Sequence, residues 1–326
     1  MSVYCQGGTP LTDPAMPVTE LGWIGTGRMG TQMVIRLLMS GSHVIVYNRT
    51  RSKAEPLADL GAVIAGHLRE LAGCHVVFVA VSSSGDLEQV LLGPEGLLSG
   101  EERPGLVVDF STVGPDASAI IREELASRGV QLLAAPVSGN PKVAGAGRLT
   151  MAVSGPLAAY ESVSGLLAQL GSGATYVGDG ELARLVKICH NLFLGVVTQS
   201  LVEVTVLAEK GGVSREAFLR YLNASVLGST FTRYKAPQLV NTDYRATFTT
   251  SLLRKDFDLG LAAAHDLGVP LPLASLVQQL VMTLTSLGYG EEDFAALLEL
   301  QARSSALELV SEGVEVPDGL GLPDER

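Results

Sequence analysis

The sequence predicts two domains of different class, an α/β domain with a doubly wound parallel sheet over residues 20–181 and an all-α domain over residues 182–311. From Glu20 onward, short apolar runs alternate with helical stretches, as expected for repeated strand–helix units. The run His75–Val81 is almost continuously apolar and β-branched, which is typical of a strand covered on both faces. Beyond residue 181 only helical patterns continue.

The bounds of the elements in the first domain are predicted from hydrophobic periodicity and from the glycine and proline residues that interrupt helices and strands. Helices are predicted over Met29–Ser40, Ser52–Leu60, Pro115–Ser127 and Ala158–Leu170. Strands are predicted over Leu21–Ile24, His43–Tyr47, Ala62–Ile64, His75–Val81, Leu106–Asp109, Val130–Ala134, Leu149–Val153 and Thr175–Val177.

The second domain begins with one long helical pattern, Glu181–Lys210, which contains no proline. Further helices are predicted over Ser214–Asn223, Leu252–Leu267, Pro272–Leu287 and Glu292–Val310. Residues 1–19 carry three prolines and lack a signal-peptide pattern, so we expect a disordered arm. Residues 312–326 are rich in proline, glycine and acid, and we expect a disordered tail.

Composition excludes several classes of function. The net charge of −11 argues against nucleic-acid binding. We expect no membrane span and no metal site, because no apolar run is long enough and no histidine spacing suits a metal. Cys5, Cys74 and Cys189 are isolated, which fits a reducing cytoplasm. Only 17% of residues are charged, so we expect further burial between subunits of a homo-dimer or larger oligomer.

A glycine-rich segment joins the first predicted strand to the first predicted helix. Gly25 permits a tight turn, Gly27 lets a pyrophosphate approach the backbone, and Gly30 allows close packing of the helix on the strand. The start of the helix then directs N–H groups at phosphate. The pattern predicts a Rossmann dinucleotide site that includes Gly25, Thr26, Gly27, Arg28, Met29 and Gly30.

The end of the second predicted strand indicates which dinucleotide binds. NAD sites usually place a carboxylate there, whereas this chain has Asn48, Arg49 and Thr50. Arg49 can pair with a 2′-phosphate by charge-assisted hydrogen bonds, so we expect NADP(H) to be preferred over NAD(H). The alternative is that Arg49 is a solvated charge that stacks on adenine.

Five motifs in order resemble the β-hydroxyacid dehydrogenase family, which includes 3-hydroxyisobutyrate dehydrogenase and glyoxylate/succinic semialdehyde reductase. They are Gly22–Gly30, the D-x-S-T of residues 109–112, the A-P-V-S-G of residues 135–139, the K-x-x-x-N of residues 187–191, and the K-D of residues 255–256. The resemblance covers residues 20–310 and implies hydride transfer between the nicotinamide and a small carboxylic acid.

The resemblance also implies roles for individual residues. Lys187 would be the catalytic acid/base, and Asn191 would orient the substrate. Ser138 and Gly139 would hold the substrate carboxylate, with Asn140 next to them. The implied cofactor contacts beyond the glycine loop and the second strand are Val81, Ser82, Asp86, Thr112 and Lys255.

Physical reasoning supports the lysine independently. Lys187 and Asn191 are four residues apart on a predicted helix, so they share one face. The apolar neighbours Leu185, Val186 and Ile188 favour desolvation, which lowers a lysine pKa. We interpret His190 as a polar neighbour, although it remains a rival base.

The substrate loop departs from the family pattern, because Asn140 and Val143 replace two expected glycines. We expect their side chains to occupy part of the usual substrate space. Lys142 either adds positive charge near the site or is a solvated loop residue.

Two other functions remain open. Imine reductases resemble the same scaffold but lack the lysine, so Lys187 argues against that activity. A non-catalytic NADP-binding or nucleic-acid-reading protein is the other alternative, which the acidic charge and Lys187 oppose. A homo-dimer packed across the Glu181–Lys210 helix remains an expectation.

Overall fold

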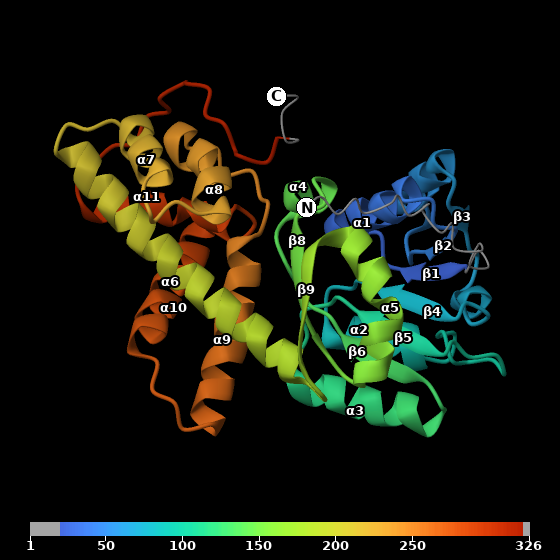
Figure 1. Ribbon diagram of the computed structural model, residues 1–326. Coiled ribbons are helices and arrows are strands. Elements are labelled where there is room, and N and C mark those ends of the chain that lie inside the picture. The colour runs from blue at the N-terminus through green and yellow to red at the C-terminus, as the bar shows by residue number, and fades with distance from the viewer. Residues whose placement is uncertain (1–19, 322–326) are drawn as a thin grey trace, which may run out of the picture.

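The computed structural model describes residues 20–321, so the arm predicted for residues 1–19 lies outside the described residues. Two lobes are visible in Figure 1, a sheet with helices on both sides and a bundle of helices. The long helix α6 (Leu182–Lys210) runs from one lobe through the other. The predicted fold class is confirmed.

The sheet has the strand order of a dinucleotide-binding fold, β3-β2-β1-β4-β5-β6, followed by β8 and β7. The first six strands pair in parallel, whereas β8 runs antiparallel to β6 and β9 pairs parallel to β8. The strands are β1 (Leu21–Ile24), β2 (Val44–Tyr47), β3 (Val63–Ile64), β4 (Val76–Val79), β5 (Leu106–Asp109), β6 (Gln131–Ala134), β7 (Val137–Ser138), β8 (Leu149–Ser154) and β9 (Gly171–Gly178).

Helices cover both faces of this sheet because its strands are apolar on both sides. Trp23 and Phe78 pack with α1 (Arg28–Met39) and α5 (Leu157–Leu170) in one core. Val77 and Val107 pack with α2 (Ser84–Leu92) and α3 (Pro115–Ser127) in another. A short helix, α4 (Pro141–Gly145), lies against α1. Because helices cover both faces of the sheet, a ligand is expected to bind at the carboxyl ends of the parallel strands.

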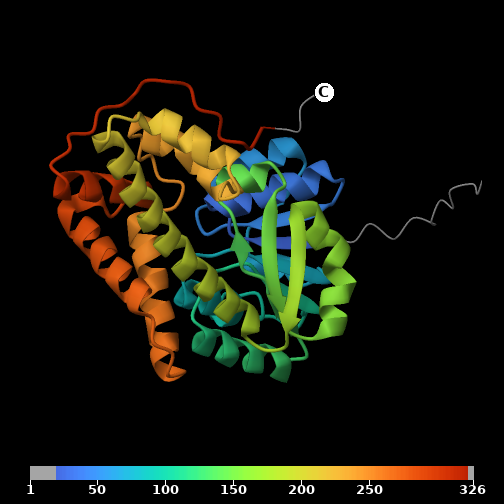
Figure 2. The same cartoon turned by 60° about the vertical axis from the view of Figure 1, so that its left-hand side comes forward.

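The helical domain forms around α6, which spans about 43 Å at 1.5 Å per residue. Its buried face carries twelve residues and packs on α9, α10 and α11. Figure 2 shows α6 crossing the front of the bundle from the edge of the sheet. The other helices are α7 (Arg215–Ala224), α8 (Thr230–Asn241), α9 (Thr250–Asp266), α10 (Pro272–Leu284) and α11 (Leu297–Ser304).

Buried ion pairs fix the first turn of α6 to the sheet. Arg184 donates to Asp109 (2.7 Å) and to the Ser111 carbonyl (3.1 Å), and both charged side chains are fully buried. Glu181 accepts from Arg122 at 2.6 Å and from Arg184 at 2.9 Å. Removing one partner of a buried pair is costly, so this junction holds α6 in a defined position relative to the sheet.

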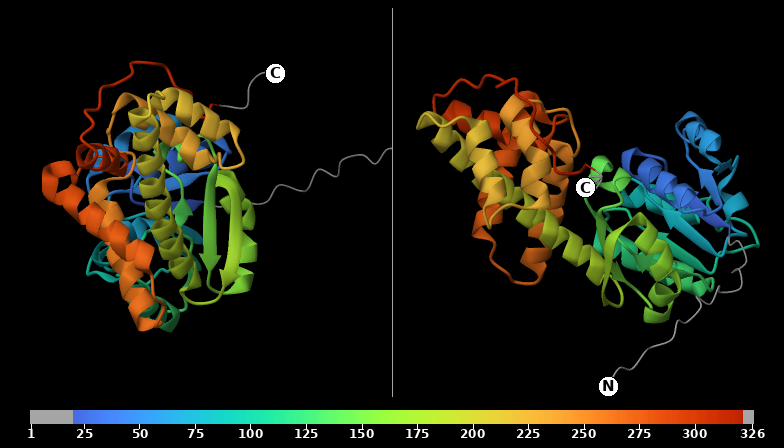
Figure 3. Two further views of the ribbon diagram at one scale, coloured as in Figure 1. Left: turned by 90° about the vertical axis from the view of Figure 1, so that its left-hand side faces the viewer. Right: turned by 45° about the horizontal axis from the view of Figure 1, so that its top comes forward.

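The prediction of a disordered tail from residue 312 is wrong for residues 312–321. This segment has no helix or strand, but Glu312 accepts from the backbone N–H groups of Arg215 and Glu216 at 2.6 and 3.1 Å. Further along, the Gly319 carbonyl accepts from Arg148, and Leu320 is buried in the first core. The segment therefore crosses from the helical domain back to the sheet domain (Figure 3).

Several element predictions differ from the structure. Residues 51–60 form two 3₁₀ segments, Arg51–Lys53 and Glu55–Leu60, where one helix is predicted. Helices α2, α4 and α8 and strand β7 are not predicted at all. Helix α8 contains Pro237 and has a weakly amphipathic pattern. The last predicted helix ends at Ser304 and not at Val310.

Within residues 20–321, α6 is long and apolar enough to cross a membrane by length and composition, so the expectation that no apolar run is long enough does not hold for this helix. It is also the central helix of the bundle, and 44% of its most apolar window is buried. No group of three or more potential metal ligands occurs in the same range.

Candidate active site

Three connected hollows form one continuous cleft along the carboxyl ends of the strands and between the domains. The first, of about 350 Å³, lies at the ends of β1 and β2, and the second, of about 400 Å³, lies over the glycine loop. Gly27, Val81 and Ser82 line both of them. The third, of about 460 Å³, shares Lys187 and Asn191 with the second and opens into the helical domain.

The glycine loop has the shape that a pyrophosphate requires. Gly25 has a φ of +97°, and a Cβ there would lie 2.2 Å from the Ala80 carbonyl oxygen. A Cβ at Gly30 would lie 2.1 Å from the Gly25 oxygen, so both positions exclude a side chain. Gly27 instead faces open space and precedes the uncapped start of α1. The residues present therefore fit a dinucleotide phosphate at the N-terminus of α1.

The residues at the end of β2 divide into a structural amide and an exposed cation. Asn48 Oδ1 accepts from the Thr26 N–H at 2.9 Å, and its Nδ2 donates to the Thr50 carbonyl at 2.9 Å. Arg49 is 85% exposed and donates to Asp86 at 3.1 Å. Asp86 lies at this end of the cleft as an ion-pair partner of Arg49, and its predicted contact with the cofactor stays a prediction. Asn48, Arg49, Thr50 and Asp86 line the first hollow, whereas Thr26 does not.

Residues from both domains meet in the middle of the cleft. The Val81 N–H donates to Ser111 Oγ at 2.9 Å, which fixes the end of β4 against β5. Lys255 on α9 donates to the Thr112 carbonyl at 3.1 Å. Met29, Val81, Ser82, Thr112 and Lys255 all line this second hollow, as does Arg28. Lys255 therefore spans the two domains here.

Lys187 lies where the second and third hollows meet. Its Nζ donates to Asn191 Oδ1 at 2.9 Å across one turn of α6. Desolvation by the surrounding protein lowers the pKa of Lys187 to about 8, and the nearby positive charge of Lys255 acts in the same direction. Asp256 opposes both effects. The amine can therefore both give and take a proton near neutral pH.

A carboxylate from α9 holds the amide beside this lysine. Asn191 Nδ2 donates to Asp256 Oδ2 at 2.5 Å, and both side chains are buried. Because a carboxylate only accepts, this contact fixes Asn191 with its oxygen toward Lys187. Asp256 belongs to the K-D motif, but the sequence does not place it beside Asn191, which lies 65 residues away.

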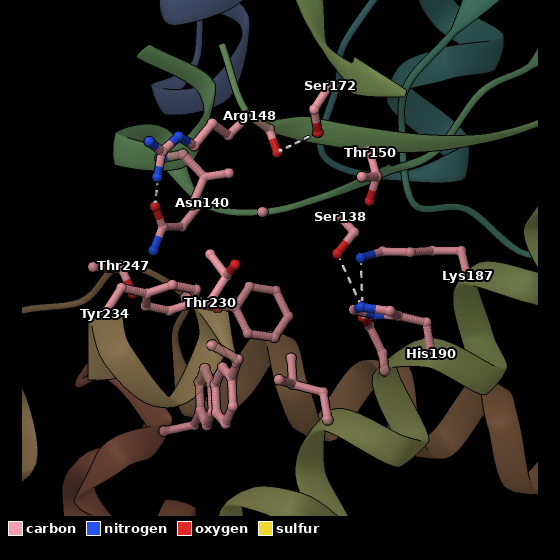
Figure 4. A pocket seen from close by; sticks show the side chains of 17 residues that line it. Ser138, Asn140, Arg148, Thr150, Ser172, Lys187, His190, Thr230, Tyr234 and Thr247 are labelled. Carbon is pink, nitrogen blue, oxygen red and sulfur yellow. Dashed lines mark hydrogen bonds between the residues drawn. The ribbon is translucent and has the colours of Figure 1, made fainter. Parts of the chain in front are cut away.

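The substrate loop presents its polar groups to the third hollow. Ser138 Oγ lies 2.9 Å from His190 Nε2, as Figure 4 shows. Gly139 has a φ of +136°, and a Cβ there would lie 2.8 Å from a Val143 methyl. Asn140 Oδ1 caps α4 by accepting from the Val143 N–H at 3.0 Å. Asn140 and Val143, the two departures from the family pattern, are therefore both buried, and both belong to the wall of the cavity.

The far end of the third hollow comes mainly from residues that the sequence pattern did not single out. Phe231, Phe248 and Phe294 form an apolar wall, and Arg148 and Tyr234 lie at the opposite end from Lys187 (Figure 4). A buried pair holds this wall, since Lys235 donates to Asp293 at 2.5 Å and Asp293 accepts from the Thr247 N–H. Most of these residues lie on α8 or its following loop, which the sequence did not predict.

The matches to known families follow the division between the domains. Residues 20–178 match the model described as the NAD binding domain of 6-phosphogluconate dehydrogenase. Residues 181–301 match the model described as the NAD-binding domain of NADP-dependent 3-hydroxyisobutyrate dehydrogenase. The 2-(hydroxymethyl)glutarate dehydrogenase of Eubacterium barkeri is 30% identical over 86% of this chain and 94% of that protein. The chain belongs to the β-hydroxyacid dehydrogenase family.

Other members of the family are similarly distant from this chain. Glyoxylate/succinic semialdehyde reductase 2 of Arabidopsis thaliana is 28% identical over 90% of this chain and 82% of the relative. The crystal structure of 3-hydroxyisobutyrate dehydrogenase from Salmonella typhimurium superimposes with a TM-score of 0.77 at 26% identity, over 86% of this chain and 99% of that one. The chain therefore belongs to a family of NAD(P)-dependent oxidoreductases.

Proposed function

We propose that this β-hydroxyacid dehydrogenase uses NADP(H) to interconvert a small carboxylate-bearing aldehyde or keto acid and its hydroxy acid, with Lys187 as the acid/base. The observation that carries the proposal is the position of Lys187 at the junction of the cofactor cleft and the substrate cavity. Its pKa of about 8 suits proton transfer in both directions.

The roles of this chain's residues follow from their positions. Bound NADPH would supply the hydride, and the Lys187 ammonium would give a proton to the substrate oxygen. In oxidation, the neutral amine would take that proton back. Asn191, held by Asp256, keeps the amine at a fixed position on α6. Ser138 and the Gly139 N–H would hold the carboxylate.

Preference for NADP(H) rests on the end of β2, which carries no carboxylate in its own sequence. The Arg49 guanidinium binds Asp86 through one nitrogen and keeps other N–H groups available for a 2′-phosphate. Lys53 lines the same hollow and adds a second cation. Arg49→Glu should therefore weaken NADPH binding far more than NADH binding.

The volume of the substrate cavity favours an acid longer than two carbons. The cavity of about 460 Å³ extends from Lys187 past Leu194 and three phenylalanines. An apolar wall of this kind suits the carbon chain of a semialdehyde. We therefore expect succinic semialdehyde to be preferred over glyoxylate.

The test is NADPH oxidation by the purified protein with glyoxylate, succinic semialdehyde and a cyclic imine in parallel. Turnover of an aldehyde acid is expected. Turnover of the imine alone would contradict the proposal and support an imine reductase. NADPH binding without any turnover would support a non-catalytic NADP-binding protein.

The proposed assembly is a homo-dimer packed on α6. The exposed faces of α6, α9 and α10 form an apolar groove of about 440 Å³, in which Phe193 is 70% exposed and Leu273 is 66% exposed. Soluble surfaces rarely leave such a patch uncovered. Sedimentation should give a dimer that Phe193→Glu dissociates, whereas Ile120→Glu on α3 should not. A monomeric wild type at micromolar concentration would contradict this.

A further inference from the structure

His190 is a polar residue of the site beside Lys187, and neither the proposed chemistry nor the family motif gives it a task. It lies on α6 next to Asn191, and its ring borders the substrate cavity. Its two ring nitrogens contact two different polar groups of the site. Nδ1 lies 2.9 Å from Asn191 Oδ1, and Nε2 lies 2.9 Å from Ser138 Oγ. Figure 4 shows His190 facing Ser138 beside Lys187.

These contacts determine which ring nitrogen carries a proton. Asp256 accepts from Asn191 Nδ2, so Asn191 presents only its oxygen to His190. An amide oxygen cannot donate, and His190 Nδ1 must therefore carry the hydrogen. In a neutral ring Nε2 is then an acceptor, and the Ser138 hydroxyl must donate to it.

This arrangement conflicts with holding an anion. A Ser138 hydroxyl that donates to His190 turns only its oxygen lone pairs toward the cavity, and a carboxylate needs a donor there. Protonation of Nε2 reverses the bond. His190 then donates to Ser138 Oγ, and the hydroxyl hydrogen becomes free for the carboxylate.

We infer that His190 is a positioning residue whose protonation turns the Ser138 hydroxyl into a donor, so that the substrate carboxylate binds together with one proton. The inference rests on the proposed function, because it assumes that the carboxylate binds at Ser138. The step moves one proton from solvent to His190 Nε2 and breaks no covalent bond.

The charges around His190 decide in which pH range the coupling operates. Burial and the positive charge of Lys187 lower the pKa of His190 in the free enzyme, while its contact with Asn191 raises it. A carboxylate at Ser138 would raise it further. Substrate affinity should therefore fall as pH rises from the free-enzyme pKa to the higher pKa of the complex. The charged or titratable groups of the surrounding elements are Lys187, Lys255, Asp256, Arg148 and Tyr234.

Isothermal titration calorimetry of the NADPH-saturated enzyme with 4-hydroxybutyrate or glycolate tests this directly. Each is the alcohol product of one aldehyde acid in the turnover assay. Heats measured at pH 7 in buffers of different ionisation enthalpy give the number of protons bound. We expect uptake of about 0.5 to 1 proton per carboxylate, and a Kd that rises by up to about tenfold per pH unit above the free-enzyme pKa.

Three variants locate the proton. His190→Gln places an amide at the position of Nε2, so it should bind the carboxylate with no proton uptake and with a Kd independent of pH between 6 and 7.5. Ser138→Ala should lose the uptake although His190 is present. Lys187→Met should retain it, because most Lys187 amines are already protonated at pH 7.

The outcomes separate the two claims. Turnover of an aldehyde acid with no proton uptake by the wild type would overturn the role of His190 and leave the proposed function intact. Uptake that disappears in Lys187→Met but persists in His190→Gln would also overturn it. Absence of both turnover and carboxylate binding would overturn the proposed function, and the inference with it.

Discussion

Lys187 shows how a single side chain acquires its chemistry from residues far away in the sequence. The amine is desolvated at the meeting of two domains, and Asp256 and Lys255 on α9 shift its pKa in opposite directions. The prediction from the sequence attributed the desolvation to Leu185, Val186 and Ile188. Val186 is 42% exposed and therefore does not bury the amine, whereas Ile188 is buried.

The pH dependence of turnover should report Lys187. The folded enzyme lowers the pKa of this amine from its ordinary 10.5 to about 8, so the ammonium is the main form below pH 8. Reduction needs the ammonium, and its kcat should be constant below pH 8 and fall about tenfold per unit above it. Oxidation needs the amine, and its kcat should rise up to pH 8 and then level off.

Rates of both directions between pH 6 and 10 provide the measurement. Lys255→Met serves as the matched control, because removing that charge should move the transition slightly upward without abolishing it. A reductive kcat that does not change between pH 7 and 10 would contradict the assignment.

The local motifs predicted which residues share a cavity, and they gave no information on long-range contacts, while the roles of these residues stay predictions. Lys187, Asn191, Ser138 and Gly139 meet at one cavity, as the motifs indicated. The role of Asp256 could not be read, because nothing in the sequence places α9 against α6. Asn48 was predicted as a cofactor contact, and its amide also braces the Thr26 backbone.

Among the elements, the glycine loop between β1 and α1 contains glycines required by the fold and one glycine that faces the proposed cofactor site. Gly25 and Gly30 have no room for a side chain, whereas Gly27 has open space around it. Gly27→Val should therefore fold normally but place a side chain where the pyrophosphate binds. We expect NADPH affinity to fall by at least about tenfold, equivalent to about 1.4 kcal/mol.

Fluorescence titration with NADPH and urea denaturation together check this prediction. Gly165→Ala on α5, which also meets no atom within 4 Å, is the control and should leave both quantities unchanged or slightly improve stability. Unchanged NADPH affinity in Gly27→Val would place the cofactor elsewhere.

Elements with strong periodicity or a short buried apolar run were predicted well. Strands β1 and β5 and helix α3 have the predicted bounds. Helix α8 is not predicted because it buries polar residues such as Lys235 and Gln238. Lys235 donates to both Gln238 and Asp293. Hydrophobic periodicity does not register a helix whose buried face is partly polar.

At the scale of the whole molecule, residues 312–321 connect the domains a second time. Asp318 lies 3.5 Å from Lys142 on α4, and Leu320 is buried against the sheet domain. Leu320→Ala should lower the free energy of unfolding by about 1–3 kcal/mol, because it removes buried methyl groups at the edge of a core. Composition alone predicts disorder here, because it contains no information on the few contacts that hold this segment against the sheet domain.

Urea denaturation followed by circular dichroism measures this change. Ile120→Ala, at an exposed site on α3, is the control and should change stability by no more than about 0.5 kcal/mol. Equal stability of Leu320→Ala and the wild type would show that the segment does not dock in solution.

The most direct test of the account is the turnover of Lys187→Met with the aldehyde acid that the wild type reduces, measured together with NADPH affinity. Methionine is similar in length but has no proton to give. We predict that kcat falls by about 10²–10⁴-fold while the Kd for NADPH stays within about twofold of the wild type. Turnover at the wild-type rate with the cofactor bound would contradict the central role of this amine.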